Sequence, residues 1–512
     1  MTKKIDNIFF YILLFVLCFA FCIQTNVVDV DLFSRLIQGK HVVQTGSVMY
    51  QDIVSFAKTH TWYDHEWLSS AIFYLVLEKF HPLGLTIFKC FLCFMVFVLV
   101  DLNIIVKTKK TNYSYRYLYI FIFCLFMHHM KLFAYLRSQD FTFIFYPLLI
   151  LLLEYTRNKQ NSKLFYIIPF FMLLWFNMHG GSMYSLGIIF LYGAGEFLNK
   201  KPYKKYFLIL IPSILVYFIN PWGVDFVNFL FNSIGVDRRW VGEWQTPLSM
   251  KPELVVIYLV QLVSICFIYL FGLIKNKFRN LDYTKVLVCF ASLVLALRYI
   301  KFNPMFFITV FIFLYEDFKT IVDFFVKNIK IKLAIKYSAI IAAIIFSINI
   351  FSNNSILNSW YYQSADEFPI RPMQFLIDND IKGRILAPYY LSGFIAYKNY
   401  PDYIIYMDGR QEQVYDYETF DKEMRFLFFS DESAFRILNE DKPEIILIEN
   451  YWHVNGYLLY DQDYYKRVYQ DEKYSIYLVP DKQLFSYQRK NETPYYTRES
   501  FFDTKIDFSK KQ

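Results

Sequence analysis

The sequence predicts an α-helical polytopic membrane protein that carries a small α/β domain at its C-terminal end. The chain has 512 residues, of which 56% are hydrophobic, and its mean hydropathy is +0.28. Apolar runs recur along the first 350 residues, as expected of repeated passages through a bilayer. After residue 352 the composition changes to charged and Tyr-rich sequence with short β-type runs, which indicates a separate domain.

About eleven apolar runs predict transmembrane helices, and residues 1–352 form the predicted membrane module. Several runs are shorter than the roughly 20 residues of an ideal span. They lie near residues 8–25, 84–106, 115–130, 140–155, 164–178, 182–198, 206–220, 253–274, 282–299, 303–316 and 336–352. The segment Leu68–Phe80 is apolar but too short to span, so we expect it to be interfacial or re-entrant.

Basic residues between the runs predict the orientation of the chain. They cluster at Lys107–Lys110, Arg157–Lys163, Lys200–Lys205, Lys275–Arg279 and Lys319–Lys336. Because cytoplasmic loops carry an excess of Lys and Arg, these loops and the N-terminus are expected in the cytoplasm. The first loop, residues 26–66, and the C-terminal region are then extracytoplasmic. The net charge of +8 is modest and its basic residues lie in these clusters, so no nucleic-acid partner is expected.

The C-terminal region predicts an extracytoplasmic α/β domain over residues 353–485, followed by a polar tail over residues 486–512. Three runs are typical of strands: Tyr403–Met407, Glu444–Glu449 and Tyr474–Val479. Residues Glu432–Leu438 favour a helix, and Asp463–Val479 is typical of a hairpin.

The first loop begins with two aspartates, Asp29 and Asp31, close to the predicted membrane edge. Such a pair can bind a divalent cation, or one carboxylate can act as a general base; a solvated loop start is the alternative. Apolar residues then recur at helical spacing from Leu32 to Val43, and Ser34, Arg35, Gln38 and Lys40 occupy the other face. This pattern predicts a helix that lies on the membrane surface and that Gly46 ends.

Other polar residues at the predicted outer edges are candidates for binding. His65 and Glu66 can complete a metal site or orient an acceptor, although His and Trp also anchor chains at the interface. Arg137, and Arg298 with Lys301, suit a phosphate group; a salt bridge or snorkelling is the alternative. His179 lies in a Gly-rich turn, where capping is the commoner role. The triplet Asp408-Gly409-Arg410 follows a predicted strand, where it can contact the membrane module or substrate or make an ordinary turn.

Several function classes lack their motifs. There is no Walker loop, no G-x-G-x-x-G between a strand and a helix, and no H-E-x-x-H. A nucleotide-fuelled pump and a zinc protease are therefore not supported. All seven cysteines fall in apolar segments without nearby metal-ligand spacing, so no disulfide is expected.

The order of these features resembles the GT-C superfamily of membrane glycosyltransferases, which use polyprenyl-phosphate-linked sugars. More closely, seven phrases resemble a large family of uncharacterised bacterial membrane proteins related to it. They are DVDLFSRLIQGKHVVQTGSVMYQDIVSF, WYDHEWL, LRSQDF, NMHGG, NPWG, EWQTP and YMDGR. The resemblance runs over most of the chain in order. It departs from the superfamily's usual D-E or E-D pair, because Val30 separates two aspartates here.

The resemblance implies a glycosyltransferase of the bacterial cytoplasmic (inner) membrane. It would move a sugar from a polyprenyl-phosphate donor to a lipid, glycan or protein acceptor on the extracytoplasmic face. Asp31 would be the general base, and Asp29, with His65 or Glu66, would bind a divalent cation or position the acceptor. Arg298, Lys301 and Arg137, together with His179, would bind the donor's phosphate.

Two alternatives come from other classes. The first is a transporter, flippase or polymerase-type protein for lipid-linked glycans. A transporter or flippase would need the phosphate-binding residues but no acidic base, and paired half-helices or repeated halves would support it. A scaffold of the same fold would tolerate the joint replacement of Asp29 and Asp31.

Overall fold

The computed structural model describes residues 3–24, 27–111, 113–129, 134–159, 162–233, 236, 238, 240–275, 281–353, 368–429, 432–460, 464–482 and 500–509. The chain divides into two compact units, each described here by itself. Unit 1 comprises Met1–Asn26, Thr86–Gly223 and Asp237–Trp360. Unit 2 comprises Val27–Leu85, Val224–Val236 and Tyr361–Gln512.

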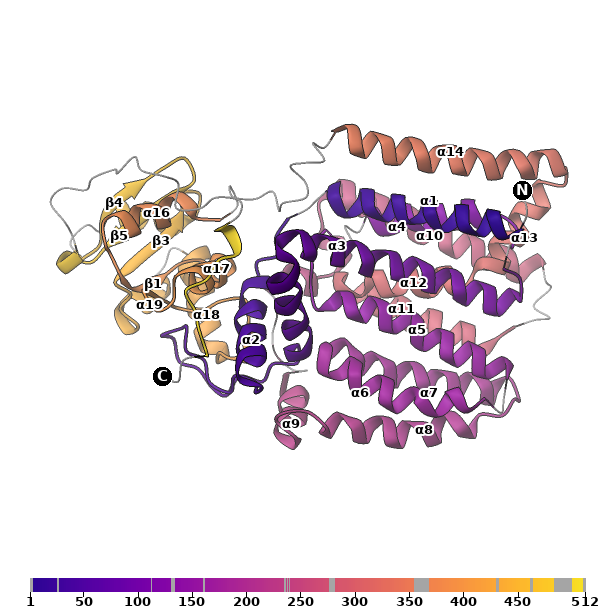
Figure 1. Ribbon diagram of the computed structural model, residues 1–512, viewed down its shortest axis with the longest axis horizontal. Coiled ribbons are helices and arrows are strands. Elements are labelled where there is room, and N and C mark those ends of the chain that lie inside the picture. The colour runs from indigo at the N-terminus through magenta and orange to yellow at the C-terminus, as the bar shows by residue number, and fades with distance from the viewer. Residues whose placement is uncertain are drawn as a thin grey trace. The chain divides into compact units, whose positions relative to one another are not determined.

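Unit 1 is built from helices that run alongside one another (Figure 1). They are α1 (Lys3–Gln24), the part of α3 (Trp67–Thr108) from Thr86 onward, α4 (Arg116–His129), α5 (Gln139–Asn158), α6 (Ile168–Met178), α7 (Met183–Leu198), α8 (Lys204–Leu215), α10 (Pro252–Lys275), α11 (Tyr283–Arg298), α12 (Asn303–Phe313), α13 (Tyr315–Phe325) and α14 (Ile329–Asn353). A helix coincides with every predicted apolar span, and α13 was not predicted.

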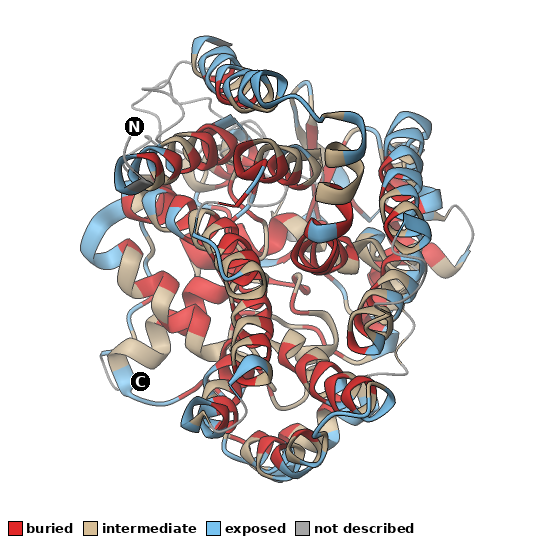
Figure 2. Ribbon diagram, turned by 90° about the vertical axis from the view of Figure 1, so that its right-hand side faces the viewer, coloured by how far each residue is buried: buried red, intermediate tan, exposed pale blue. Residues whose placement is uncertain are grey.

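The outer faces of these helices expose large apolar side chains, while buried residues lie toward the interior (Figure 2). Along α10 the exposed residues include Val256, Val260, Val263 and Phe267. Water disfavours such a surface, whereas lipid tails are as apolar as these side chains. Unit 1 is therefore a membrane module.

Four helices among the described residues are long and apolar enough to cross a membrane. They are Lys4–Gln24, Trp67–Thr108, Pro252–Lys275 and Ile329–Ser352. The other predicted spans are shorter helices, so about eleven crossings remain a prediction. The predicted interfacial segment Leu68–Phe80 is the first part of α3. A break at His81, whose φ is 58°, separates it from the rest of the helix just before Pro82.

Charged side chains inside unit 1 are paired. Arg157 lies 2.6 Å from Glu196 and 2.8 Å from Asp282, and Lys107 lies 3.2 Å from Glu154. The sequence places both basic residues in clusters that predict orientation, and the structure gives them ion-pair partners as well. Charges at membrane depth are tolerated when they face the protein interior and pair in this way.

The core of unit 2 is a five-stranded sheet with the order β2-β1-β3-β5-β4. Its strands are β1 (Gly383–Leu386), β2 (Tyr403–Ile405), β3 (Ile445–Glu449), β4 (Lys466–Gln470) and β5 (Tyr474–Leu478). Strands β2, β1 and β3 are parallel, and β5 and β4 extend the sheet as an antiparallel hairpin. The three predicted strands and the hairpin are confirmed, and β1 was missed.

The helices of unit 2 come from three stretches of the chain. They are α2 (Leu32–Thr45), the first part of α3, α9 (Val224–Ser233), α16 (Ile370–Asp378), α17 (Tyr389–Asn399), α18 (Tyr417–Phe428), α19 (Arg436–Glu440) and α20 (His453–Tyr460). The predicted helix Glu432–Leu438 is a 3₁₀ turn over Glu432–Phe435 that leads into α19.

Helix α2 ends at Gly46 as predicted, but its polar face is not solvated. Ser34, Arg35 and Gln38 are as buried as the apolar residues beside them. A Cβ atom added at Gly39 would overlap the carbonyl of Ser70, so α2 and the first part of α3 are in close contact. An amphipathic helix on a membrane surface would keep its polar face in water. In unit 2 this face has polar partners instead: Ser34 bonds to Asp408, and Arg35 pairs with Asp64.

The end of the chain also differs from the predicted polar tail. Residues 483–499 lie outside the described part, but 500–509 pack onto unit 2. Phe501 and Phe502 are buried, with ring centroids 5.9 and 6.0 Å from that of Phe33 on α2. The hydroxyl of Tyr397 donates a 2.9 Å hydrogen bond to the carbonyl of Phe502. Residues 500–509 therefore belong to the folded core of unit 2.

Candidate active site

The two aspartates of the first loop form the turn that starts α2. The backbone N–H of Asp31 donates to the Asp29 carboxylate (2.9 Å), and the N–H of Leu32 donates to the Asp29 carbonyl (3.1 Å). Asp29 is buried and Asp31 is half-buried. Asp31 is the N-cap residue, yet its side chain accepts no capping hydrogen bond from α2. The Asp31 carboxylate is therefore not used to cap α2.

The triplet Asp408-Gly409-Arg410 lies against this turn. A Cβ atom added at Gly409 would overlap a carboxylate oxygen of Asp31, so the two residues touch. The hydroxyl of Ser34, in the first turn of α2, donates a 2.8 Å hydrogen bond to Asp408. The sequence left open whether this triplet is an ordinary turn or contacts the rest of the protein. The structure shows that the triplet contacts Asp31 and the first turn of α2.

Arg410 holds this triplet in place through buried hydrogen bonds. Its buried guanidinium donates to Asp408 (2.7 Å), to Asp52 (2.5 Å) and to the hydroxyl of Tyr415 (2.9 Å). It also lies over the ring of Trp62, at 4.6 Å from the centroid. Burial lowers the pKa of Arg410, but the charges of Asp408 and Asp52 outweigh it and raise that pKa well above its usual value. Arg410 is therefore a permanent cation between two buried carboxylates.

The first loop is joined to the sheet by backbone hydrogen bonds. Phe56 N–H donates to the Ile405 carbonyl (2.9 Å), and Ile405 N–H donates to the Val54 carbonyl (3.0 Å). Farther along, His60 N–H donates to the Val414 carbonyl (2.9 Å). Residues 54–56 therefore pair with the free edge of β2, His60 pairs with the segment that follows Arg410, and the loop is part of the same folded unit as the C-terminal sheet.

Arg35 pairs with the carboxylates at the end of the first loop, Asp64 and Glu66. Its guanidinium pairs with Asp64 and lies 3.2 Å from the Glu66 carboxylate. It also donates to the side-chain oxygen of Gln413 (3.2 Å). Burial lowers the pKa of Arg35, but Asp64 and then Glu66 and Asp31 raise it by more. The fully buried Asp64 thus has a cationic partner in Arg35, and the same guanidinium also interacts with the charge of Asp31.

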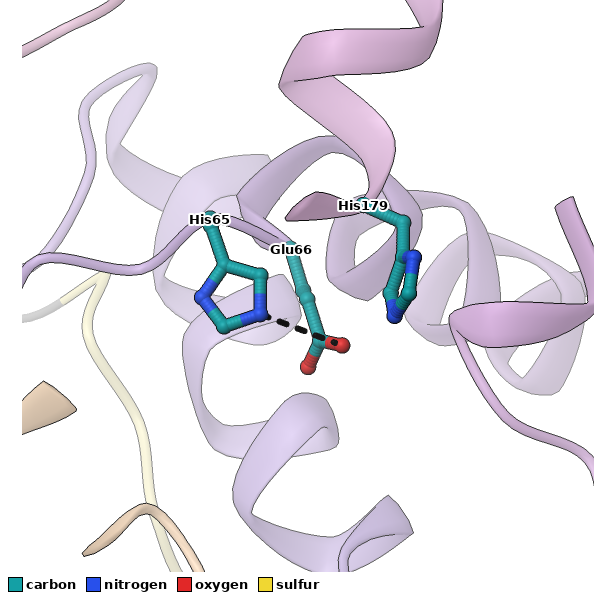
Figure 3. A group of neighbouring side chains, drawn as sticks. All are labelled: His65, Glu66 and His179. Carbon is teal, nitrogen blue, oxygen red and sulfur yellow. Dashed lines mark ion pairs between the residues drawn. The ribbon is translucent and has the colours of Figure 1, made fainter. Parts of the chain in front are cut away.

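His65 and Glu66 follow Asp64 with their side chains toward one another (Figure 3). The Nε2 atom of His65 lies 3.7 Å from a Glu66 oxygen. One imidazole nitrogen and one carboxylate in adjacent positions are a donor set that suits Mn²⁺ or Zn²⁺. Their predicted role as metal ligands stays a prediction.

The predicted phosphate-binding residues belong to unit 1, and the structure brings two of the three basic ones together. Arg137 lies 3.2 Å and Lys301 lies 3.6 Å from the carboxylate of Glu243. Lys301 also lies over the ring of Trp244, at 3.7 Å from the centroid. The structure thus shows the salt bridge that was the alternative to phosphate binding. Arg298 is exposed and lies over Tyr299 (5.2 Å), outside this group.

His179, also drawn in Figure 3, caps the turn that starts α7. Its Nδ1 accepts from the N–H of Gly181 (3.0 Å) and from the hydroxyl of Thr142 (2.8 Å). That hydroxyl in turn accepts from the indole N–H of Trp175 (2.9 Å). Since Nδ1 is an acceptor, the neutral ring carries its proton on Nε2. His179 has the capping role that its turn favoured, and its Nε2–H can donate to an anion.

Replacing Gly409 with Ala should lower activity without unfolding unit 2. The added methyl would displace the Asp31 carboxylate, and misplacing a reactive group by about 1 Å can cost on the order of 10²-fold in rate. Gly456→Ala is the matched control, because a Cβ there meets nothing within 4 Å. The measurement compares sugar transfer and thermal unfolding for both variants. Equal activity in the two would show that Gly409 does not position Asp31.

Comparison with known proteins gives a fold but no family. No protein-family model and no curated protein sequence matches the chain. The structure is similar to the crystal structure of the Archaeoglobus fulgidus oligosaccharyltransferase tethered with an acceptor peptide containing the NVT sequon via a disulfide bond. The TM-score is 0.52 at 8% sequence identity, covering 86% of this chain and 69% of that chain. The likeness shows that this chain shares the fold of that protein.

Proposed function

We propose that this protein is a GT-C-type glycosyltransferase that moves a sugar from a polyprenyl-phosphate donor to an acceptor on the extracytoplasmic face of the bacterial cytoplasmic membrane. The observation that carries the proposal is the placement of Asp31. Its carboxylate lies against Gly409, in the triplet that the buried hydrogen bonds of Arg410 hold in place. It does not cap the helix that it begins.

Asp31 is the general base of this reaction. An acceptor hydroxyl attacks the anomeric carbon while its proton passes to the Asp31 carboxylate. The bond between that carbon and the phosphate oxygen breaks, and polyprenyl phosphate leaves with the electron pair. General-base catalysis of this kind contributes roughly 10²–10⁴-fold. Asp29 holds the turn that presents Asp31, through the 2.9 Å bond from the Asp31 N–H.

The donor's phosphate is bound by basic groups of unit 1. Arg137 and Lys301 already share one carboxylate, Glu243, so an incoming phosphate would take the place of that partner. Arg298 and the Nε2–H of His179 are further donors. A guanidinium matches phosphate geometry with two parallel hydrogen bonds, and fixed positive charge stabilises the leaving group as its charge develops.

A divalent cation would be held by His65 and Glu66, with Asp29 or Asp31 as an alternative site. When bound, it would supply positive charge to the departing phosphate. Chelation with EDTA should then abolish transfer and Mn²⁺ should restore it. Glu66→Gln should raise the Mn²⁺ concentration needed by about 10–100-fold, whereas Glu418→Gln, at an exposed carboxylate, should not. Full activity in EDTA would rule out the cation.

The proposed function is tested with the purified protein in lipid vesicles. A set of synthetic polyprenyl-phosphate sugars is incubated with candidate acceptors, and product is detected by mass spectrometry. Transfer of one sugar with release of polyprenyl phosphate supports the proposal. If the protein moves intact lipid-linked glycan across the bilayer and breaks no glycosidic bond, it is a transporter.

A further inference from the structure

Aromatic side chains gather where two neighbouring parallel strands of unit 2 end. β1 ends at Leu386, and Tyr390 follows in the first turn of α17. β3 ends at Glu449, and Tyr451 and Trp452 follow directly. The register pairs Leu386 with Ile446, so both connections leave the same edge of the sheet.

The two connections diverge at this edge. The chain after β1 passes through α17 to β2, on one side of β1, whereas the chain after β3 passes through α20 to the β4–β5 hairpin on the other side. In open α/β sheets, ligands bind at the carboxyl ends of strands where the connections diverge in this way. The topology therefore singles out the surface formed by Tyr390, Glu449 and Trp452, which are hydrogen-bonded to one another.

A buried carboxylate lies at the centre of the aromatic group. Glu449 accepts hydrogen bonds from the hydroxyls of Tyr390 and Tyr451 (2.9 Å for Tyr451) and from the indole N–H of Trp452 (3.2 Å). Burial and then the charge of Glu449 raise the pKa of Tyr390, so its hydroxyl remains a donor. Each aromatic ring is thus fixed by its polar atom.

The rings themselves are not all covered. Tyr451 is 65% exposed and Phe428 is 45% exposed, and both pack against Trp452, with centroids 4.8 and 4.9 Å from it. Large exposed rings held rigidly around a polar group are a common form of recognition surface, because they give contact area at little entropic cost.

The chemistry of this group favours a neutral sugar. The hydroxyls of Tyr390 and Tyr451, which donate to Glu449, can accept hydrogen bonds from sugar hydroxyls, and the C–H face of a sugar ring can pack on Tyr451 or Trp452. A phosphate or carboxylate ligand would meet the charge of Glu449 at close range and be repelled. Lys473 lies 3.6 Å from the other oxygen of this carboxylate, and its side chain is 40% exposed.

The aromatic group shares its sheet edge with the candidate active site. β2 ends at Ile405, and the triplet that begins with Asp408 follows it at this edge. Glu423 of α18 interacts with the loops that follow β1 and β2. It accepts a 2.6 Å hydrogen bond from the N–H of Tyr389, in the loop after β1. Its pKa is raised well above the usual value by burial and by the charge of Asp408.

We propose that Tyr390, Glu449, Tyr451 and Trp452 form a carbohydrate-binding subsite that holds a neutral glycan acceptor. This assignment rests on the proposed function in naming the ligand as the acceptor. It narrows the acceptor from a lipid, glycan or protein to a molecule that presents at least one uncharged sugar ring.

Sugar binding is tested directly on the full-length protein in detergent. Saturation-transfer NMR is recorded with neutral di- and trisaccharides that contain glucose, galactose, mannose or N-acetylglucosamine. At least one should receive saturation from the wild type, and both Trp452→Ala and Glu449→Gln should weaken its binding about tenfold or more. Trp452→Phe keeps an aromatic ring, so its sugar binding should be weakened less. Residual binding in this variant would show that binding is lost through the missing ring and not through misfolding.

The matched control is Tyr464→Ala. Tyr464 is 51% exposed and precedes β4, whose first residue Lys466 pairs with Leu478 at the opposite edge of the sheet. Its loss should leave sugar binding unchanged. If no saccharide receives saturation, or if Tyr464→Ala weakens binding as much as Trp452→Ala, the subsite is refuted.

A kinetic experiment separates this proposal from the proposed function. With a glycan acceptor, Trp452→Ala should raise the KM for acceptor about tenfold, with little change in kcat. Transfer with an unchanged KM in Trp452→Ala would overturn the acceptor subsite and leave the glycosyltransferase intact. Saccharide binding without any transfer would overturn the glycosyltransferase and the acceptor role together, leaving only a sugar-binding surface.

Discussion

Asp31→Asn should lower sugar transfer by about 10³-fold, because an amide cannot take the proton of the acceptor hydroxyl. The protein should remain folded, since Asp31 does not cap α2 and an amide occupies the same volume. The measurement is the transfer rate in lipid vesicles at saturating donor, beside a thermal unfolding curve. Donor binding should be retained, which separates a lost base from a lost binding site.

Asp380→Asn is the matched control for this variant. Its side chain is 85% exposed in the same unit, so the substitution removes an equal charge far from any buried partner. It should transfer sugar at the wild-type rate. Full activity of Asp31→Asn would show that another group takes the proton, and Asp29 and Glu66 would be the next to replace.

Arg410→Met should destabilise unit 2 by about 3–5 kcal/mol, because it leaves two buried carboxylates without their cation. Asp408 and Asp52 both pair with this guanidinium and are themselves buried there. The free energy of unfolding is measured by denaturant titration in detergent. Replacing Asp408 and Asp52 with Asn in the same protein should recover part of the loss, since neutral amides cost less to bury than charges.

Arg425→Met provides the comparison. Arg425 is 40% exposed and pairs with Asp421 one helical turn away, an arrangement that contributes roughly 0.3–0.5 kcal/mol. The free energy of unfolding of Arg425→Met should therefore be almost that of the wild type. If Arg410→Met lowered the free energy of unfolding no more than Arg425→Met, the ion pairs of Arg410 would not be what holds the Asp408-Gly409-Arg410 triplet in place.

Much of the fold could be predicted because its signals are local. Apolar runs mark helices wherever they occur, and Gly46 ends α2 as its backbone freedom suggests. The strands that begin at Tyr403, Ile445 and Tyr474 are short runs of residues typical of sheets. β1 was missed because its sequence, Gly383–Leu386, begins with Gly and Arg, which leaves only two consecutive residues typical of a strand.

The site could be predicted only in part, because its partners come from distant stretches of the chain. Asp31 and Gly409 are 378 positions apart in the numbering, and no local pattern reveals that they touch. Arg35 was read as the polar side of a surface helix, whereas Asp64 and Glu66 receive it in the interior. A signal was present: an arginine within an apolar helix, close to an acidic cluster, needs a partner when the helix is buried.

The central claim is that this protein transfers a single sugar, and it is tested most directly by mass spectrometry of lipid-linked and surface glycans. A deletion strain is compared with the same strain complemented by the wild type or by Asp31→Asn. The account predicts glycans that lack one sugar in the deletion strain and in the Asp31→Asn strain, and complete glycans with the wild type. Accumulation of complete lipid-linked glycan in the deletion strain would contradict it and indicate transport or polymerisation.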